Sequence, residues 1–282
     1  MIQVELIKDL KENINIAKTA NKTIGFVPTM GYLHEGHMAL VSQARNENDF
    51  VVMSIFVNPA QFGPNEDLGR YPRDLERDKK MAIEAGVDLL FYPQEEEMYP
   101  KDGGISIQAG RLANVLCGAT RAGHFDGVLK VVTKLFHLIE PTRAYFGQKD
   151  AQQLAIIETL VRDYNFPLEI RRVETVREED GLAKSSRNVF LSKEERMQAP
   201  AIYQALQLGI NHYMNTRKSG KAMQETLQHI EKFTSGKIDY VGFLSYPDLT
   251  SDLEEASTVI MAVAVYFEKA RLIDNIIINK EV

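Results

Sequence analysis

The stretch Pro28-Thr29-Met30-Gly31-Tyr32-Leu33-His34-Glu35-Gly36-His37 joins an apolar run, residues 23–27, to a second run, residues 38–44. The first run predicts a buried strand, and the second predicts a helix. Where a strand leads through a glycine-containing loop into a helix, free backbone N–H groups and the positive end of the helix dipole meet, and phosphate is favoured. The stretch therefore predicts a binding site for nucleotide phosphates.

Two histidines, His34 and His37, flank Gly36 in this stretch. At a spacing of three, both imidazoles can lie on one side of the first helical turn and donate hydrogen bonds to phosphoryl oxygens. An ordinary surface or core pair is the alternative. A zinc site is disfavoured, because the segment is one residue shorter than the His-Glu-x-x-His pattern of zinc proteases and Cys117 is the only cysteine.

The composition limits the class of protein. With 282 residues, the chain can form one large domain or two smaller ones. Its longest apolar run, residues 259–267, is too short to span a bilayer, and the N-terminal segment lacks the apolar core of a signal peptide, so we predict a cytoplasmic protein without membrane contact. A net charge of −6 disfavours a nucleic-acid surface and leaves small molecules as the expected partners.

Strand and helix patterns alternate over the first two-thirds of the chain. The run at residues 50–57 completes a strand–helix–strand unit with the opening stretch. Further strands are predicted at residues 87–92, 144–146 and 168–173, and helices at 74–85, 128–139 and 150–163. This order is typical of a Rossmann-like, doubly wound parallel α/β sheet, whose ligands bind beyond the carboxyl ends of the strands.

From about residue 178 the pattern changes. Helices at 193–216 and 221–233 precede strands at 238–245, 257–266 and 271–278. Consecutive strands indicate an antiparallel meander in a smaller α+β domain. We therefore predict a Rossmann-like domain at residues 1–176 and an α+β domain at residues 177–282.

Amides and cations follow the predicted strands. Asn58 and Gln61 can bind a hydroxyl or carboxylate, or they can cap a turn. Arg121 and His124, in a glycine-punctuated loop before a helix, can bind anions or be surface residues.

Two more segments have the composition of phosphate-binding loops. In residues 147–150, Gly147 lets a ligand approach the backbone and Lys149 adds a cation, while Asp150 is also a candidate helix cap. Residues 184–187 offer two hydroxyls and two cations that can clamp phosphates, with a solvated loop as the alternative.

Together these segments resemble the pantoate–β-alanine ligases, or pantothenate synthetases, in the nucleotidyltransferase-like α/β superfamily. The resemblance covers essentially the whole chain. The motifs that carry it are residues 28–31 with 34–37, 57–59 with 61–62, 71–73, 147–150 with 152–153, and 185–188. Members of the family condense (R)-pantoate with β-alanine, using ATP and forming a pantoyl adenylate.

The resemblance implies roles for particular residues. The ATP site would comprise Pro28, Thr29, Met30, Gly31, Tyr32, Leu33, His34, Glu35, Gly36, His37, Gly147, Gln148, Lys149, Asp150, Val176, Lys184, Ser185, Ser186 and Arg187. His37 would donate a proton, and His34, Lys149 and Arg187 would act beside it on the phosphates. Gln61 and Gln153 would hold pantoate, with Asn58 a further candidate from its position. At position 184 an apolar residue is expected in the family, so whether the lysine side chain or only its backbone meets phosphate stays open.

The resemblance also implies partners and motions. Residues 1–176 would bind ATP and pantoate, residues 177–282 would form a lid, and the enzyme would be a homodimer. Mg²⁺ is expected to bind through ATP oxygens and water, so no metal residue is predicted, although Asp78 is a candidate ligand. The loop at residues 62–73 and the lid would close over the labile adenylate.

Three other functions share some of these features. A nucleotidyltransferase that moves AMP or CMP onto a phosphorylated acceptor would share the two-histidine loop but would need more cations. A small protein related to tRNA synthetases would need a basic surface for RNA, which this acidic chain lacks. A non-catalytic nucleotide-binding module would keep the pocket without turnover. The amides of Asn58, Gln61 and Gln153 favour the ligase.

Overall fold

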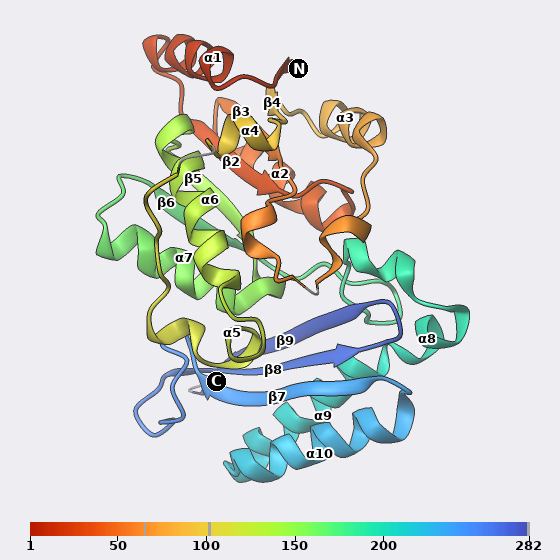
Figure 1. Ribbon diagram of the computed structural model, residues 1–282. Helices are drawn as coiled ribbons and strands as arrows, with labels where there is room; N and C mark the ends of the chain where they lie inside the picture. Colours follow the sequence, from red (N-terminus) through yellow and green to blue (C-terminus); the bar gives the residue numbers. More distant parts are fainter. Residues whose placement is uncertain (65, 101–102, 281–282) are drawn as a thin grey trace. The chain divides into compact units, whose positions relative to one another are not determined.

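The computed structural model describes residues 1–64, 66–100 and 103–280, which form two compact units (Figure 1). The first unit comprises Met1–Ala109, Arg121–Gln148 and Ile156–Glu174, and the second comprises Gly110–Thr120, Lys149–Ala155 and Thr175–Val282. The predicted domains at 1–176 and 177–282 include residues 65, 101, 102, 281 and 282, which lie outside the described ranges. Their division into a substrate-binding domain and a lid stays a prediction.

The first unit contains a six-stranded parallel sheet. Its strands are β1 (Ile2–Val4), β2 (Ile24–Thr29), β3 (Phe50–Ile55), β4 (Leu89–Phe91), β5 (Arg143–Gly147) and β6 (Glu169–Val173). The order β1-β4-β3-β2-β5-β6 confirms the predicted doubly wound sheet. From β2 the chain adds β3 and β4 on one side, and from β5 it adds β6 on the other. The order of the strands therefore reverses between β2 and β5. Ligands of such sheets bind at the carboxyl ends of the strands at this point.

Helices cover this sheet on both faces. Those lying within the first unit are α1 (Ile7–Thr19), α2 (Glu35–Glu47), α3 (Leu75–Glu84), α4 (Glu95–Met98) and α6 (His124–Ile139), with short 3₁₀ helices η1 (Pro59–Gln61) and η2 (Asp67–Arg70), whereas η4 (Gln148–Asp150) and α7 (Ala151–Asp163) have residues in both units. Val27 of β2 is buried with Leu40 and Val41 of α2, whereas the neighbouring Phe26 meets Phe136 of α6 edge to face. The alternation along β2 therefore places α2 on one face and α6 on the other.

The second unit contains a three-stranded antiparallel sheet, which confirms the predicted meander. Its elements are η3 (Arg111–Ala113), α5 (Leu116–Thr120), η5 (Ser186–Phe190), α8 (Lys193–Gln198), α9 (Ala201–Thr216), α10 (Ser219–Phe233), β7 (Lys237–Ser245), β8 (Thr258–Tyr266) and β9 (Arg271–Asn279). The central strand is buried on both faces. Met261 and Val263 share a core with α9 and α10, whereas Ile260 and Ala262 meet Leu116 and residues of 151–155. Among the described residues, no helix combines the length and the apolar character that crossing a membrane requires.

Close packing of α9 against α10 and β8 depends on Gly209. A Cβ at this position would lie 2.1 Å from Thr226 Oγ1 and 2.7 Å from Met261 Sδ. We predict that Gly209→Ala lowers the free energy of unfolding by about 1–3 kcal/mol, because the packed elements must move apart. Gly220→Ala on α10 is the matched control, since its Cβ would meet nothing within 4 Å. Urea denaturation that gives both variants the same stability would contradict this account of the packing.

Candidate active site

The connection from β2 to α2 is a tight turn in the left-handed backbone region. Gly31 has a φ of +82° and Tyr32 a φ of +50°. A Cβ on Gly31 would lie 3.0 Å from both Asp78 Oδ2 and Ile55 Cγ2, so only glycine fits this position without strain. The N–H of Gly31 donates to Thr29 Oγ1 over 3.2 Å, and that hydroxyl donates to the Ser54 carbonyl of β3. The sheet thus holds the start of the turn.

Asp78 of α3 holds the rest of the turn. Its side chain is buried, with Oδ2 accepting from the Tyr32 N–H and Oδ1 from the Leu33 N–H, each over 2.7 Å. Burial raises the pKa of Asp78, whereas the bonds from Leu33 and Tyr32 lower it. Because both oxygens already accept backbone hydrogens, Asp78 fits the role of a loop anchor better than that of the candidate Mg²⁺ ligand. Among the residues described, no group of three or more His, Cys, Asp or Glu side chains is arranged to hold a metal ion.

The turn leads directly into the two histidines. His34 is the N-cap of α2, and its Nδ1 accepts from the Gly36 N–H over 3.1 Å, while Nδ1 of His37 accepts from the His34 N–H over 3.2 Å. The two ring centroids are 4.1 Å apart. Since each Nδ1 is an acceptor, the hydrogen of each neutral ring lies on Nε2. The structure therefore places both imidazoles together at the N-terminus of α2, each with an N–H donor, and their contact with phosphate stays a prediction.

A hollow in the first unit lies beside this turn, at the carboxyl ends of β2, β3 and β4. Its lining residues are Met30, Gly31, Tyr32, Ile55, Phe56, Val57, Arg73, Asp74, Leu75, Asp78, Tyr92, Pro93, Gln94 and Glu95. The Arg77 guanidinium lies over the Tyr32 ring, 5.1 Å from its centre. The hollow is at the sheet edge where the sequence predicts ligands.

The predicted amide residues lie together just after β3. Asn58 and Gln61 are both buried, and Asn58 Nδ2 donates to Gln61 Oε1 over 2.9 Å. The Gln61 carbonyl accepts from His124 Nδ1 over 2.7 Å, and His124 Nε2 lies 3.0 Å from Arg121 Nη1. Arg121 and His124, for which the sequence left anion binding or a surface role open, thus support the backbone of Gln61.

Arg121 also forms a forked ion pair with Glu66, with distances of 2.7 and 2.5 Å. Burial raises the pKa of Glu66, but hydrogen bonds and charge from Arg121 outweigh it, so the pKa is lowered overall. Glu66 belongs to the predicted closing loop, residues 62–73, of which residue 65 lies outside the described residues. The described part of this loop is therefore tied to the start of α6.

Gly147 ends β5, and Gln148 follows it in the first unit. A Cβ on Gly147 would meet nothing within 4 Å, so the backbone here is open to close approach, as the sequence predicts. The next candidates along the chain belong to the second unit. There the Lys149 ammonium lies 3.6 Å from the Asp150 carboxylate, the Lys149 carbonyl accepts from Asn275 Nδ2, and Gln153 is half-buried on α7.

The remaining candidates form one turn of the second unit. The Lys184 N–H donates to the Val176 carbonyl over 2.9 Å, and the Lys184 ammonium lies 3.8 Å from Glu178. Ser185 is the N-cap of η5, with its Oγ accepting from the Arg187 N–H over 3.3 Å, and Ser186 is buried beside it. The structure thus brings together Val176 and residues 184–187, which the sequence predicts to bind ATP.

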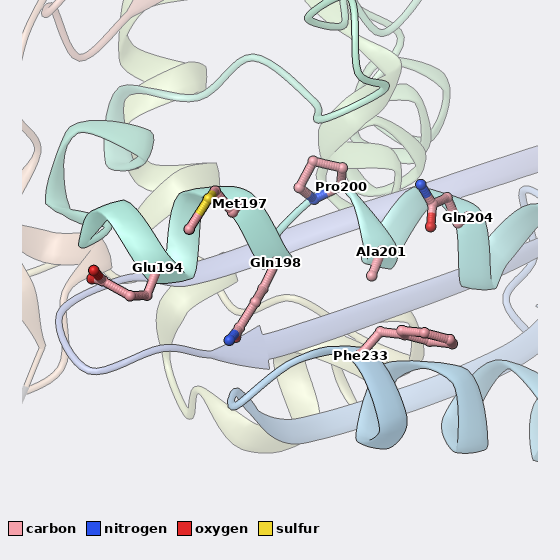
Figure 2. A pocket seen from close by; sticks show the side chains of 7 residues that line it. All are labelled: Glu194, Met197, Gln198, Pro200, Ala201, Gln204 and Phe233. Carbon is pink, nitrogen blue, oxygen red and sulfur yellow. The ribbon is translucent and has the colours of Figure 1, made fainter.

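A separate hollow in the second unit lacks the features of a nucleotide site. Figure 2 shows its lining, which comprises Glu194, Met197, Gln198, Pro200, Ala201, Gln204 and Phe233. The one charged side chain there is a carboxylate, which would repel phosphate. This hollow is therefore not a candidate for ATP.

Sequence reasoning missed several residues that support the site. The sequence offers Asp78 only as a candidate metal ligand, and it does not single out Glu66, Tyr99, whose hydroxyl donates to Asn58 Oδ1, or the ion pair of Arg177 with Asp274. Arg177 donates to both Asp274 oxygens over 2.6 and 2.9 Å, which anchors the turn at residues 176–187 to β9. These partners are distant in sequence, so no local spacing signals them.

The anchoring of the turn can be tested on α3. We predict that Asp78→Ala lowers the free energy of unfolding by about 2–4 kcal/mol, because two backbone N–H groups lose their acceptor and that of Leu33 is buried. Glu76→Ala, at an exposed position of the same helix, should change stability by less than about 0.5 kcal/mol. Chemical denaturation that finds the two variants equally stable would contradict the anchoring role.

Several known proteins are similar to this chain over nearly its whole length. The family model for pantoate-beta-alanine ligase matches residues 3–277. A pantothenate synthetase of Lysinibacillus sphaericus is 62% identical over 269 residues, covering 95% of each chain. The crystal structure of pantothenate synthetase from Thermus thermophilus superposes with a TM-score of 0.92 at 46% identity, over 98% of this chain and 99% of that one.

A second solved structure carries ligands. The pantoate-beta-alanine ligase of Francisella tularensis, complexed with β-γ ATP and β-alanine, superposes with a TM-score of 0.82 at 35% identity. The superposition covers 100% of this chain and 98% of that one. The match of the family model and of these relatives extends over nearly the whole chain, which therefore belongs to the pantoate–β-alanine ligase family.

Proposed function

We propose that this ligase condenses (R)-pantoate with β-alanine to pantothenate through a pantoyl adenylate, releasing AMP and pyrophosphate. The observation that carries the proposal is the imidazole pair at the N-terminus of α2, with ring centroids 4.1 Å apart, in a chain matched along residues 3–277 by the ligase family. ATP and β-alanine are the ligands named for the Francisella tularensis relative. The transfer of AMP or CMP to a phosphorylated acceptor is not favoured by any of these relatives.

In the first step, a pantoate carboxylate oxygen attacks the α-phosphorus of ATP. The bond from that phosphorus to the bridging oxygen breaks, and pyrophosphate leaves with the electron pair. Two anions must approach each other, so the barrier depends on positioning and on donors aimed at the developing charge. We assign this work to the Nε2–H groups of His34 and His37, with Lys149 and Arg187 as cations.

In the second step, the free amine of β-alanine attacks the carbonyl carbon of the adenylate. The bond from that carbon to the phosphate oxygen breaks, AMP leaves, and the new amide nitrogen loses a proton. Gln61 and Gln153 hold pantoate through both steps in this proposal. A retained adenylate is protected from water, which is the reason to expect closure by the loop at residues 62–73 and by the lid.

Mg²⁺ is proposed to enter with ATP, held by phosphate oxygens and water. The donor chemistry of Asp78 supports this, since both of its carboxylate oxygens already accept backbone hydrogens. The ion would lower the negative charge that pantoate must approach. We also propose a cytoplasmic location, as the sequence predicts, and a homodimer, as the family resemblance implies; light scattering of the purified protein tests the dimer.

The reaction is tested by product analysis. We predict that AMP forms continuously only when ATP, pantoate and β-alanine are all present, because the amine is needed to release the adenylate. Without β-alanine, pyrophosphate should stop at about one equivalent of enzyme. Pyrophosphate release that requires a phosphorylated acceptor instead of pantoate would contradict the ligase and support the nucleotidyltransferase.

The role of His37 is tested in a single turnover. We predict that His37→Ala slows pyrophosphate release by about 10²–10³, since losing one donor at a developing charge costs about 3–4 kcal/mol. His137→Ala, at an exposed position on α6, should keep the rate of the unchanged protein. Near-normal adenylate formation by His37→Ala would remove His37 from the proposed machinery.

A further inference from the structure

Asn58 is buried, with 1% of its surface exposed, and its amide is fully hydrogen-bonded. Nδ2 donates to the Gly127 carbonyl over 3.0 Å and to Gln61 Oε1 over 2.9 Å. Oδ1 accepts from the Ala60 N–H over 3.2 Å and from the Tyr99 hydroxyl over 2.7 Å. Two hydrogens and two lone pairs are the full capacity of an amide side chain, so Asn58 retains no group for a substrate.

Backbone groups fix which way this amide points. The Gly127 carbonyl can only accept and the Ala60 N–H can only donate, so Nδ2 must face the former and Oδ1 the latter. The atom of Gln61 that faces Nδ2 must then be its oxygen, because two amide NH₂ groups cannot bond to each other. The orientation of the Gln61 amide is thus dictated from the backbone through Asn58.

We infer that Asn58 is a positioning residue that makes Gln61 present its NH₂ group, and not its carbonyl oxygen, to pantoate. Gln61 Nε2 lies on the opposite side of its amide from Asn58, 3.3 Å from Met30 Sδ. A hydroxyl or carboxylate oxygen of the substrate is a stronger acceptor than a thioether. The inference rests on the proposed function, in which Gln61 holds pantoate.

The backbone of Gln61 is held as firmly as its side chain. Its carbonyl accepts from His124, and α6 packs directly on η1 at Gly127. A Cβ on Gly127 would lie 2.1 Å from the Ala60 carbonyl oxygen and 2.5 Å from the Gln61 nitrogen. Only a glycine lets α6 approach closely enough for its carbonyl to reach Asn58.

A double-mutant cycle tests the inference on the intact enzyme. Asn58→Ser should raise the KM for pantoate about tenfold and leave the KM for ATP within about twofold, because one oriented hydrogen bond is lost. Gln61→Ala should raise the KM for pantoate at least as much. Since Asn58 acts only through Gln61, the double variant should match Gln61→Ala within about twofold.

Three outcomes overturn the inference. If the two effects multiply in the double variant, Asn58 contacts pantoate itself. If Asn58→Ser leaves the KM for pantoate unchanged, or raises both KM values together, Asn58 does not orient Gln61. Should Asn58→Ser fail to fold, Asn58→Asp keeps the size, removes the N–H donors and enters the same cycle.

Matched controls separate positioning from loss of stability. Val52→Ala truncates a fully buried side chain of β3 and should lower the melting temperature without changing either KM. The unchanged enzyme must first convert pantoate and β-alanine to pantothenate. Failure there rejects the proposed function, whereas turnover with an additive cycle rejects only the role of Asn58.

Discussion

The two hydrogen bonds from the Tyr32 and Leu33 N–H groups to Asp78 are the constraint on which the site depends. They keep a turn with two successive left-handed residues in place, and that turn decides where α2 begins. His34 is the N-cap of α2, and its Nδ1 accepts from the Gly36 N–H. The direction of both imidazoles therefore follows from the turn. A carboxylate on α3 thus determines the position of donors that it does not touch.

The orientation of the Gln61 amide is likewise fixed by buried hydrogen bonds. The carbonyl of Gly127 and the N–H of Ala60 orient Asn58, which orients Gln61. In both places a glycine is needed, because a Cβ on Gly31 would crowd Asp78 and one on Gly127 would collide with η1. Buried, fully bonded polar groups hold a donor in one orientation before the substrate arrives, which lowers the cost of binding and of reaction.

The sequence predicted most of the fold because its signals are local. The strand–turn–helix unit around residues 28–37 and both sheets follow from apolar patterns, but β1, with only three residues, is too short to stand out. The closeness of His34 and His37 was predictable from their spacing. The partners that hold the turn and Asn58 were not predictable, since Asp78 lies 45 positions beyond Leu33 and Tyr99 lies 41 positions beyond Asn58. Such residues meet only in the folded protein. In the sequence, Asp78 therefore has no visible partner and stands as a candidate metal ligand.

The central claim is that pantoate is activated as an adenylate at the N-terminus of α2, and an isotope measurement tests it most directly. Pantoate carrying oxygen-18 in its carboxylate is converted with ATP and β-alanine, and the AMP is examined by mass spectrometry. The account predicts a labelled oxygen in the phosphate of AMP, because the attacking carboxylate oxygen stays on phosphorus when the amine displaces it. Unlabelled AMP, with the label in pyrophosphate or orthophosphate, would contradict the account.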